Sequence, residues 1–86
     1  MKDLQALREN IDQLDQQLWE IIGKRVNVAR EIGEWKRTHR EPVIQMQRFQ
    51  EVLDHSRKLG EQYGLSDEVV REITEALHKE SVRVES

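Results

Sequence analysis

The sequence predicts an all-α fold of three helices, the first of them much longer than the others. Before Pro42, apolar residues recur at alternating steps of three and four, which is the period of a helix and not of a strand. Aromatic residues make up only 5% of the chain, and runs of β-branched residues are few, which argues against a sheet. No repeat and no long linker divides the 86 residues, so we expect one domain over residues 1–86.

The composition excludes several classes of protein. The chain has no cysteine, which removes disulfide frameworks and thiolate zinc sites. No apolar run is long enough to cross a membrane, and the start, Met1 to Leu4, lacks the apolar core of a signal peptide, so we expect a cytoplasmic protein without membrane association. The formal net charge of −3 argues against a general surface for nucleic acid, although local basic clusters remain compatible with it.

The first helix is expected over about residues 4–38, and it carries two apolar stripes. Its main seam consists of Leu7, Ile11, Leu14, Leu18, Ile21, Val28, Ile32 and Trp35. The stripe beside it consists of Trp19, Ile22, Val26, Ala29 and Gly33. A helix with two adjacent apolar stripes has to be covered on two sides. The two tryptophans are therefore expected in the core.

The length of this helix predicts an oligomer. At the rise of an α-helix it measures roughly 50 Å, whereas a compact globule of this chain length is only about 30 Å across. The rest of the chain is too short to cover both stripes of such a rod. We therefore expect an intertwined homodimer, a six-helix bundle in which two long helices pack together and the shorter helices wrap them.

Two shorter helices follow the break at Pro42. The second is expected over about residues 45–62, and Gly64 is a natural terminator after it. Ser66, followed by two acidic residues, has the pattern of an N-cap, so the third helix is expected to continue to about residue 84. The residues expected to face inward are Met46, Phe49, Val52, Leu53 and Leu59 in the second helix and Val70, Ile73, Leu77 and Val84 in the third.

One position of the main seam is cationic. Steps of four from Ile21 and of three back from Val28 meet at Arg25, and a guanidinium on an apolar seam is unfavourable unless an anion pairs with it. Lys36 lies on nearly the same face about 16 Å further along the axis. Two readings stay open: a salt-bridge network within a helical bundle, and a site for a small anion. Arg8 is too far along the helix to join this site within one chain, but an antiparallel partner helix would bring it there.

Other chemistry is sparse. The three histidines show no metal-binding spacing, the serines have no evident His/Asp partners for nucleophilic catalysis, and no Gly-rich phosphate loop is present. We therefore expect neither a metal nor a cofactor.

Several short motifs together resemble one known family over nearly the whole chain. They are Leu7-Arg8, Ile11-Asp12, Leu14-Asp15, Lys24-Arg25, Glu31-Ile32-Gly33 with Lys36, Pro42-Val43, Arg48 and Glu80-Ser81-Val82. In their combined spacing they resemble the all-helical chorismate mutase family. The resemblance implies the Claisen rearrangement of chorismate to prephenate in phenylalanine and tyrosine biosynthesis. It also implies a homodimer with two equivalent sites.

The resemblance also implies roles for individual residues. Arg25 pairs with one substrate carboxylate, and Arg8 of the other subunit pairs with the second. Lys36 donates to the ether oxygen of the breaking bond. The remaining implied contacts are Arg48 and Ser81 at the carboxylate end, Ile32 against the carbon skeleton, a backbone contact from Gln45, and Glu85 near the ether oxygen.

This chain departs from the family pattern at four positions. Gln45 replaces the usual Asp, Phe49 replaces a Glu that usually receives the substrate hydroxyl, and His78 occupies a usually apolar position. Glu85 stands where a Gln, or in some members a Glu, reaches the ether oxygen. Only a protonated Glu85 donates a hydrogen bond there, so activity is expected to rise as the pH falls below neutrality. The alternative is that Glu85 frays into solvent.

Three further readings stay open at this point. Isochorismate–pyruvate lyases share the fold and the cationic site. A non-catalytic helical dimerisation or regulatory module would instead neutralise Arg25 with carboxylates such as Asp12 or Asp15 of a partner helix. With Phe at position 49, the chain is also similar to mutase domains fused to an aldol-type synthase of the shikimate pathway. A fused or associated synthase domain is therefore a further expectation.

Overall fold

The first helix extends along almost half of the chain. The computed structural model describes residues 3–86, and in it α1 spans Leu4–His39. Asp3 caps its start by accepting a hydrogen bond at Oδ1 from the Ala6 amide at 2.8 Å. Its end is closed by Arg40 in the left-handed conformation, with φ of 57°, and by the Glu41 amide, which donates to the Lys36 carbonyl at 2.8 Å. The expected long helix is thus confirmed.

Two shorter helices form a hairpin. Helix α2 spans Met46–Gln62 and α3 spans Asp67–Glu85, in agreement with the sequence prediction to within one or two residues. Gly64 adopts a φ of +73° in the turn between them, a conformation that favours glycine. Ser66 caps α3, since its Oγ accepts a hydrogen bond from the Val69 amide at 3.2 Å. Residues 3–86 contain no strand.

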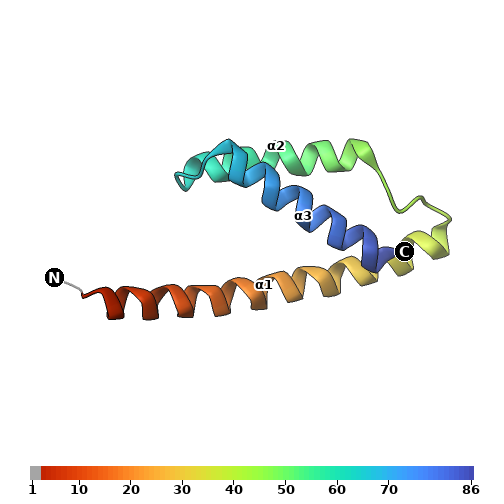
Figure 1. Ribbon diagram of the computed structural model, residues 1–86. Helices are drawn as coiled ribbons and strands as arrows, with labels where there is room; N and C mark the ends of the chain where they lie inside the picture. Colours follow the sequence, from red (N-terminus) through yellow and green to blue (C-terminus); the bar gives the residue numbers. More distant parts are fainter. Residues whose placement is uncertain (1–2) are drawn as a thin grey trace.

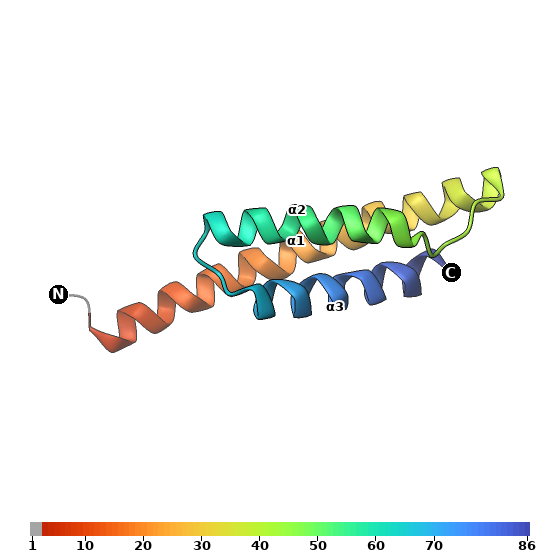
Figure 2. The same ribbon diagram turned by 90° about the horizontal axis from the view of Figure 1, so that it is seen from above.

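Helix α3 holds the other two helices together. It packs against both α1 and α2, whereas α1 and α2 do not pack against each other within residues 3–86. Figure 1 shows α3 running obliquely between them and approaching α1 only towards its own C-terminal end. Figure 2 shows the same three helices from above, with the N-terminal part of α1 reaching beyond the hairpin.

Glycines permit the two closest helix contacts. A Cβ built on Gly60 of α2 would collide with Cγ2 of Val70 in α3. A Cβ built on Gly33 of α1 would lie 2.7 Å from Cα of Glu85, at the end of α3. Because real Cβ atoms do not approach other heavy atoms that closely, each glycine permits α3 to lie close to its neighbour. Gly60 therefore closes the hairpin, and Gly33 seats the end of α3 on α1.

The chain buries little apolar surface by itself. Its buried hydrophobic residues are Ala29, Leu53 and Val70, and no large side chain among residues 3–86 is completely buried. The radius of gyration is 16.1 Å, compared with about 12 Å for a compact globule of this length. The described part of the chain is therefore an open, elongated arrangement, with a core that is small for its size.

Several residues expected to face inward are exposed within this chain. On α1, Trp19 is 67% exposed and Trp35 is 55% exposed. Among the inward positions proposed for the hairpin, Met46, Leu59 and Ile73 are exposed as well. The apolar periodicity placed these residues correctly on helices, but within residues 3–86 of one copy their side chains stay 41–67% exposed.

No helix within residues 3–86 is long and apolar enough to cross a membrane. The expectation about a signal peptide rests in part on Met1 and Lys2, which lie outside the described residues.

Candidate active site

A cavity of about 520 Å³ lies where the three helices converge. It occupies space that α1 and α2 leave between them because α3 alone bridges the two. Its lining consists of Arg25, Val28, Ala29, Ile32, Trp35 and Lys36 of α1, Val43 and Gln45 of the connection, Arg48, Phe49 and Val52 of α2, and Thr74, His78, Ser81, Val82 and Glu85 of α3. Apolar side chains thus surround a small set of charged and polar ones, as is usual for a ligand site.

Arg25 is held by a hydroxyl from another helix. Its Nη1 donates to Oγ of Ser81 at 3.1 Å, across 56 positions of sequence. Within residues 3–86 the guanidinium makes no ion pair, and the residue is solvent-exposed. The reading in which a carboxylate neutralises Arg25 therefore finds no support inside one chain, and the guanidinium keeps donors for an anion.

Lys36 and Glu85 form an ion pair at the wall of the cavity. Lys36 Nζ donates to Glu85 Oε1 at 2.5 Å and to the Val43 carbonyl at 2.7 Å. The two side chains are only 13% and 8% exposed. Arg37 fixes the same end of α3, because its Nη1 donates to the Glu85 carbonyl oxygen at 3.2 Å. The alternative in which Glu85 frays into solvent is therefore wrong.

The start of α2 brings Arg48 and Gln45 to the opposite side of the cavity. Arg48 Nη1 lies 3.4 Å from Glu51 Oε2, and the Arg48 side chain is 71% exposed. Gln45 is the N-cap of α2 and accepts a hydrogen bond at its carbonyl from the Phe49 amide at 3.0 Å. Its side-chain Nε2 donates back to the Pro42 carbonyl at 3.2 Å, so the side chain is tied to the connection.

Phe49 and His78 face each other across the hairpin. Their ring centroids are 4.4 Å apart and their planes are tilted by 36°. Both residues are half-buried and both line the cavity. Phe49 carries no polar group, so the imidazole of His78 is the only polar group that this pair of rings offers to a substrate.

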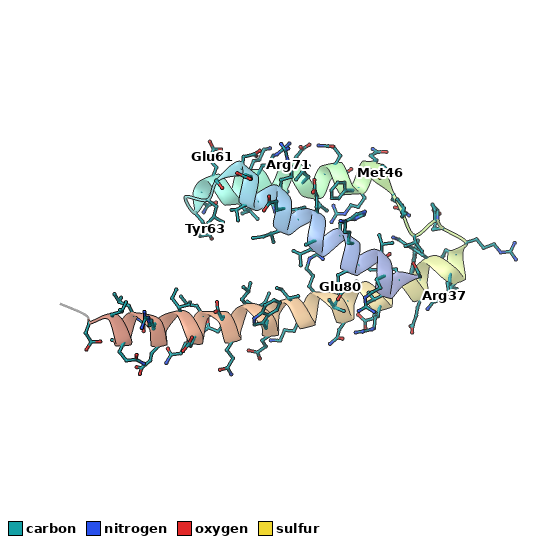
Figure 3. The ribbon with its side chains drawn as sticks, in the orientation of Figure 1. Arg37, Met46, Glu61, Tyr63, Arg71 and Glu80 are labelled. Atoms are coloured by element: carbon teal, nitrogen blue, oxygen red, sulfur yellow. The ribbon has the colours of Figure 1, made fainter. Side chains whose placement is uncertain are left out.

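Figure 3 shows the two ends of the hairpin. Glu61 and Tyr63 lie at the far end, next to the turn between α2 and α3. Met46 lies at the opposite end of α2, and Glu80 lies where α3 comes close to α1. The charged lining residues therefore gather where α3 meets α1 and where α2 begins, and not at the turn.

Comparison with known proteins decides the family. The model of the family described as chorismate mutase type II matches residues 7–86, which is nearly the whole chain. The chain belongs to the chorismate mutase type II family. This confirms the resemblance found in the sequence motifs.

Individual relatives are more distant and mostly longer. The chain is 29% identical over 84 residues to the T-protein of Enterobacter agglomerans, matching 98% of this chain but 22% of that protein. It is 28% identical over 82 residues to the 4-amino-4-deoxychorismate mutase of Streptomyces pristinaespiralis, matching 95% of this chain and 64% of that protein. For the protein of the same name from Streptomyces venezuelae the identity is 28% over 83 residues, with 96% and 81% matched. The chain thus spans about a fifth of the first of these relatives.

The cavity of this family member gathers all but one of the residues that the sequence singled out. Arg25, Ile32, Lys36, Gln45, Arg48, Phe49, Ser81 and Glu85 all line it. Arg8 does not line it; it lies exposed in the N-terminal part of α1. This placement agrees with the geometric expectation that Arg8 cannot reach the site of its own chain.

The sequence analysis missed one aromatic lining residue. Trp35 was expected in the core, but it lines the cavity and stacks on His39 with ring centroids 3.9 Å apart. Its position between Ile32 and Lys36 on one face of α1 was a signal that could have found it. Thr74 was also missed; it is buried on α3 beside the cavity, where the pattern suggested no polar residue.

Residues 3–86 contain no cluster of His, Asp and Glu side chains able to hold a metal ion.

Proposed function

We propose that this chain catalyses the rearrangement of chorismate to prephenate in the cavity between its three helices. The observation that carries the proposal is the gathering of Arg25, Lys36 and Arg48 around one apolar cavity in a member of the chorismate mutase type II family. Chorismate is a flexible dianion, and its rearrangement forms and breaks bonds within one molecule. The protein has to hold a compact conformer and stabilise charge on the breaking ether oxygen.

The three cations are suited to different parts of that task. Arg25 is preorganised by Ser81 and pairs with one substrate carboxylate, while Ser81 adds a hydrogen bond at the same end. Arg48 supports the carboxylate end from α2, with the backbone at Gln45 beside it. Ile32 packs against the carbon skeleton.

Lys36 is suited to the ether oxygen. Its ammonium group has three donors, and two of them are engaged by the Val43 carbonyl and the Glu85 carboxylate. The third is left to point at a substrate oxygen from a fixed position. A donor that is already oriented costs no reorganisation when charge develops in the transition state.

A second copy of the chain would complete the site. The seam residues Leu7, Ile11, Leu14 and Leu18 are each about half exposed, and the N-terminal half of α1 has almost no cover from its own chain. Two α1 helices packed antiparallel would bury these seams and carry Arg8 of one copy towards the cavity of the other. Arg8 would then bind the second substrate carboxylate.

The helical unit is also proposed to work together with an attached domain. The T-protein of E. agglomerans is several times longer than the matched segment, which supports the idea that a helical unit of this kind works when joined to a further domain. We keep the expectation of a fused or associated synthase as part of the proposal. Electrophoresis of the native gene product would test it by its mass.

Product analysis tests the proposed activity. The purified chain is incubated with chorismate, the loss of chorismate absorbance is followed, and the product is identified by chromatography. We expect prephenate. A parallel incubation with isochorismate tests the lyase reading, for which the expected products are salicylate and pyruvate. Absence of any chorismate turnover by a folded dimer would favour the non-catalytic module.

A further inference from the structure

The cavity has an unbalanced set of charges. Among the described residues that line it, Arg25, Lys36 and Arg48 are the basic side chains, whereas Glu85 is the one carboxylate. That carboxylate is already committed, because Lys36 Nζ lies 2.5 Å from its Oε1 and its side chain is only 8% exposed. A bound molecule therefore meets a cationic surface with no carboxylate available to pair with a positive group.

Two carboxylates outside the lining, Glu51 and Glu80, are each paired with an arginine. Glu51 pairs with Arg48 at 3.4 Å and is 58% exposed. Glu80 pairs with Arg83, and this contact lowers the pKa of the Glu80 carboxyl. Neither residue lines the cavity. If Arg8 of a second copy enters the site, as proposed above, the positive charge increases further.

The wall between α2 and α3 adds no anionic group. It consists of Phe49 and His78, whose rings are 4.4 Å apart, so one face of the phenyl ring is already covered by the imidazole. His78 can only add positive charge when it takes up a proton. Gln45, one turn before Phe49, contributes an amide whose Nε2 donates to Pro42.

We propose that this cavity selects its substrate by charge at the 4-position, accepting chorismate and rejecting 4-amino-4-deoxychorismate. This inference rests on the proposed mutase function. Chorismate carries two carboxylates and a neutral hydroxyl, whereas the amine of the 4-amino compound is protonated near neutral pH, as primary alkylamines are. The amino compound thus loses part of its attraction to the cations in any orientation. It also has to leave its ammonium group without a carboxylate partner.

The selection would separate this chain from relatives to which it is similar. Two of them, at 28% identity, are named 4-amino-4-deoxychorismate mutases. A difference in substrate charge does not require a different fold, only a different set of charges around the same cavity. Phe49 is the position where such a change can be tested, because it lines the cavity, is half-buried and carries no charge.

The test compares kcat/KM for the two substrates at pH 7. We expect the wild-type chain to favour chorismate roughly ten- to hundredfold, the effect of like charges about 6–8 Å apart at an intermediate dielectric. The ratio should shrink when NaCl is raised from about 20 mM to about 500 mM, because salt screens charges. A preference based on shape alone would not respond to salt in this way.

Two matched variants locate the determinant. Phe49→Glu supplies a carboxylate and should narrow the ratio at least about fivefold, since an opposite charge then faces the ammonium group. Phe49→Gln introduces a side chain of nearly the same size as Glu but without its charge. This variant should keep the wild-type ratio of kcat/KM for the two substrates. A ratio that moves equally in both variants would contradict selection by charge at this position.

The outcomes distinguish this inference from the mutase function itself. Equal kcat/KM for both substrates, with chorismate converted to prephenate, would overturn the selection and leave the mutase function standing. Preference for the amino compound would overturn it in the same way. Turnover of neither substrate would overturn both proposals. If Phe49→Glu fails to fold, as judged by circular dichroism, the salt dependence of the wild-type ratio still decides.

Discussion

The contribution of Arg25 to catalysis can be compared with that of Ser81, whose hydroxyl accepts a hydrogen bond from it. We expect Arg25→Ala to cost about 3–5 kcal/mol of transition-state stabilisation, because it removes a charged contact to a carboxylate. Ser81→Ala removes the hydroxyl that accepts from the guanidinium at 3.1 Å and that is proposed to bind the same carboxylate, but it removes no charge, so it should cost less, about 1–3 kcal/mol. Steady-state kinetics with chorismate measure both. Equal losses in the two variants would mean that Arg25 does not touch the substrate.

Glu85 gives a second prediction at this scale. Its carboxylate faces Lys36 in the cavity wall, and only its protonated form can donate to a substrate oxygen. Glu85→Gln should therefore raise kcat/KM for chorismate at pH 7, since an amide at this position can donate a hydrogen bond without taking up a proton. Steady-state kinetics of the two proteins measure the difference. An unchanged kcat/KM in Glu85→Gln would contradict a role for Glu85 at the ether oxygen.

The site could be predicted from sequence only in part, and individual residues show why. Arg25 and Lys36 were recognisable because they interrupt an apolar pattern on one helix face. The ion pair between Lys36 and Glu85 joins positions 49 residues apart, so it depends on where α3 lands on α1. Helical periodicity carries no such information. Trp35 was misplaced for a related reason, since an apolar residue on a seam fits a core and a cavity wall equally well.

The close packing of the end of α3 on α1 depends on the absence of a side chain at Gly33. A Cβ at this position would lie 2.7 Å from the Cα of Glu85, so Gly33→Ala has to push the end of α3 away. We expect kcat/KM to fall roughly ten- to hundredfold, because Lys36 and Glu85 lose their alignment. Chorismate kinetics provide the measurement, with circular dichroism to show that the helices persist.

Gly23 provides the matched control on the same helix. A Cβ there meets nothing within 4 Å. Gly23→Ala should therefore raise the free energy of unfolding by up to about 1 kcal/mol through helix propensity and leave activity nearly unchanged. Urea unfolding of the two variants measures the difference. If Gly33→Ala behaves like Gly23→Ala in both assays, the close approach at Glu85 has no part in forming the site.

Helix boundaries were predictable because local chemistry sets them. Pro42 and the residues before it end α1, Gly64 permits the turn, and Ser66 caps α3 through the Val69 amide. The inward faces were less predictable. Ile73 was expected to be buried and is 50% exposed within the chain, because burial depends on partners that a single helix pattern does not identify.

For the molecule as a whole, the small core predicts that folding and association are coupled. Residues 3–86 extend over 57 Å in their longest dimension with only three buried hydrophobic residues. A chain in this state should gain its stability from a second copy. We expect it to sediment as a dimer and its Tm to rise with protein concentration. A folded monomer whose Tm does not depend on concentration would rule out a shared site.

Mixing two inactive variants tests the shared catalytic site most directly. Arg8→Ala and Arg25→Ala should each be nearly inactive as homodimers. After random exchange of subunits, half of the dimers are mixed and each holds one site with both arginines intact, so about a quarter of the wild-type activity should return. Exchange is verified by mass spectrometry of differently tagged subunits. If mixed dimers form and activity stays at the level of the separate variants, Arg8 and Arg25 do not complete one site from two chains.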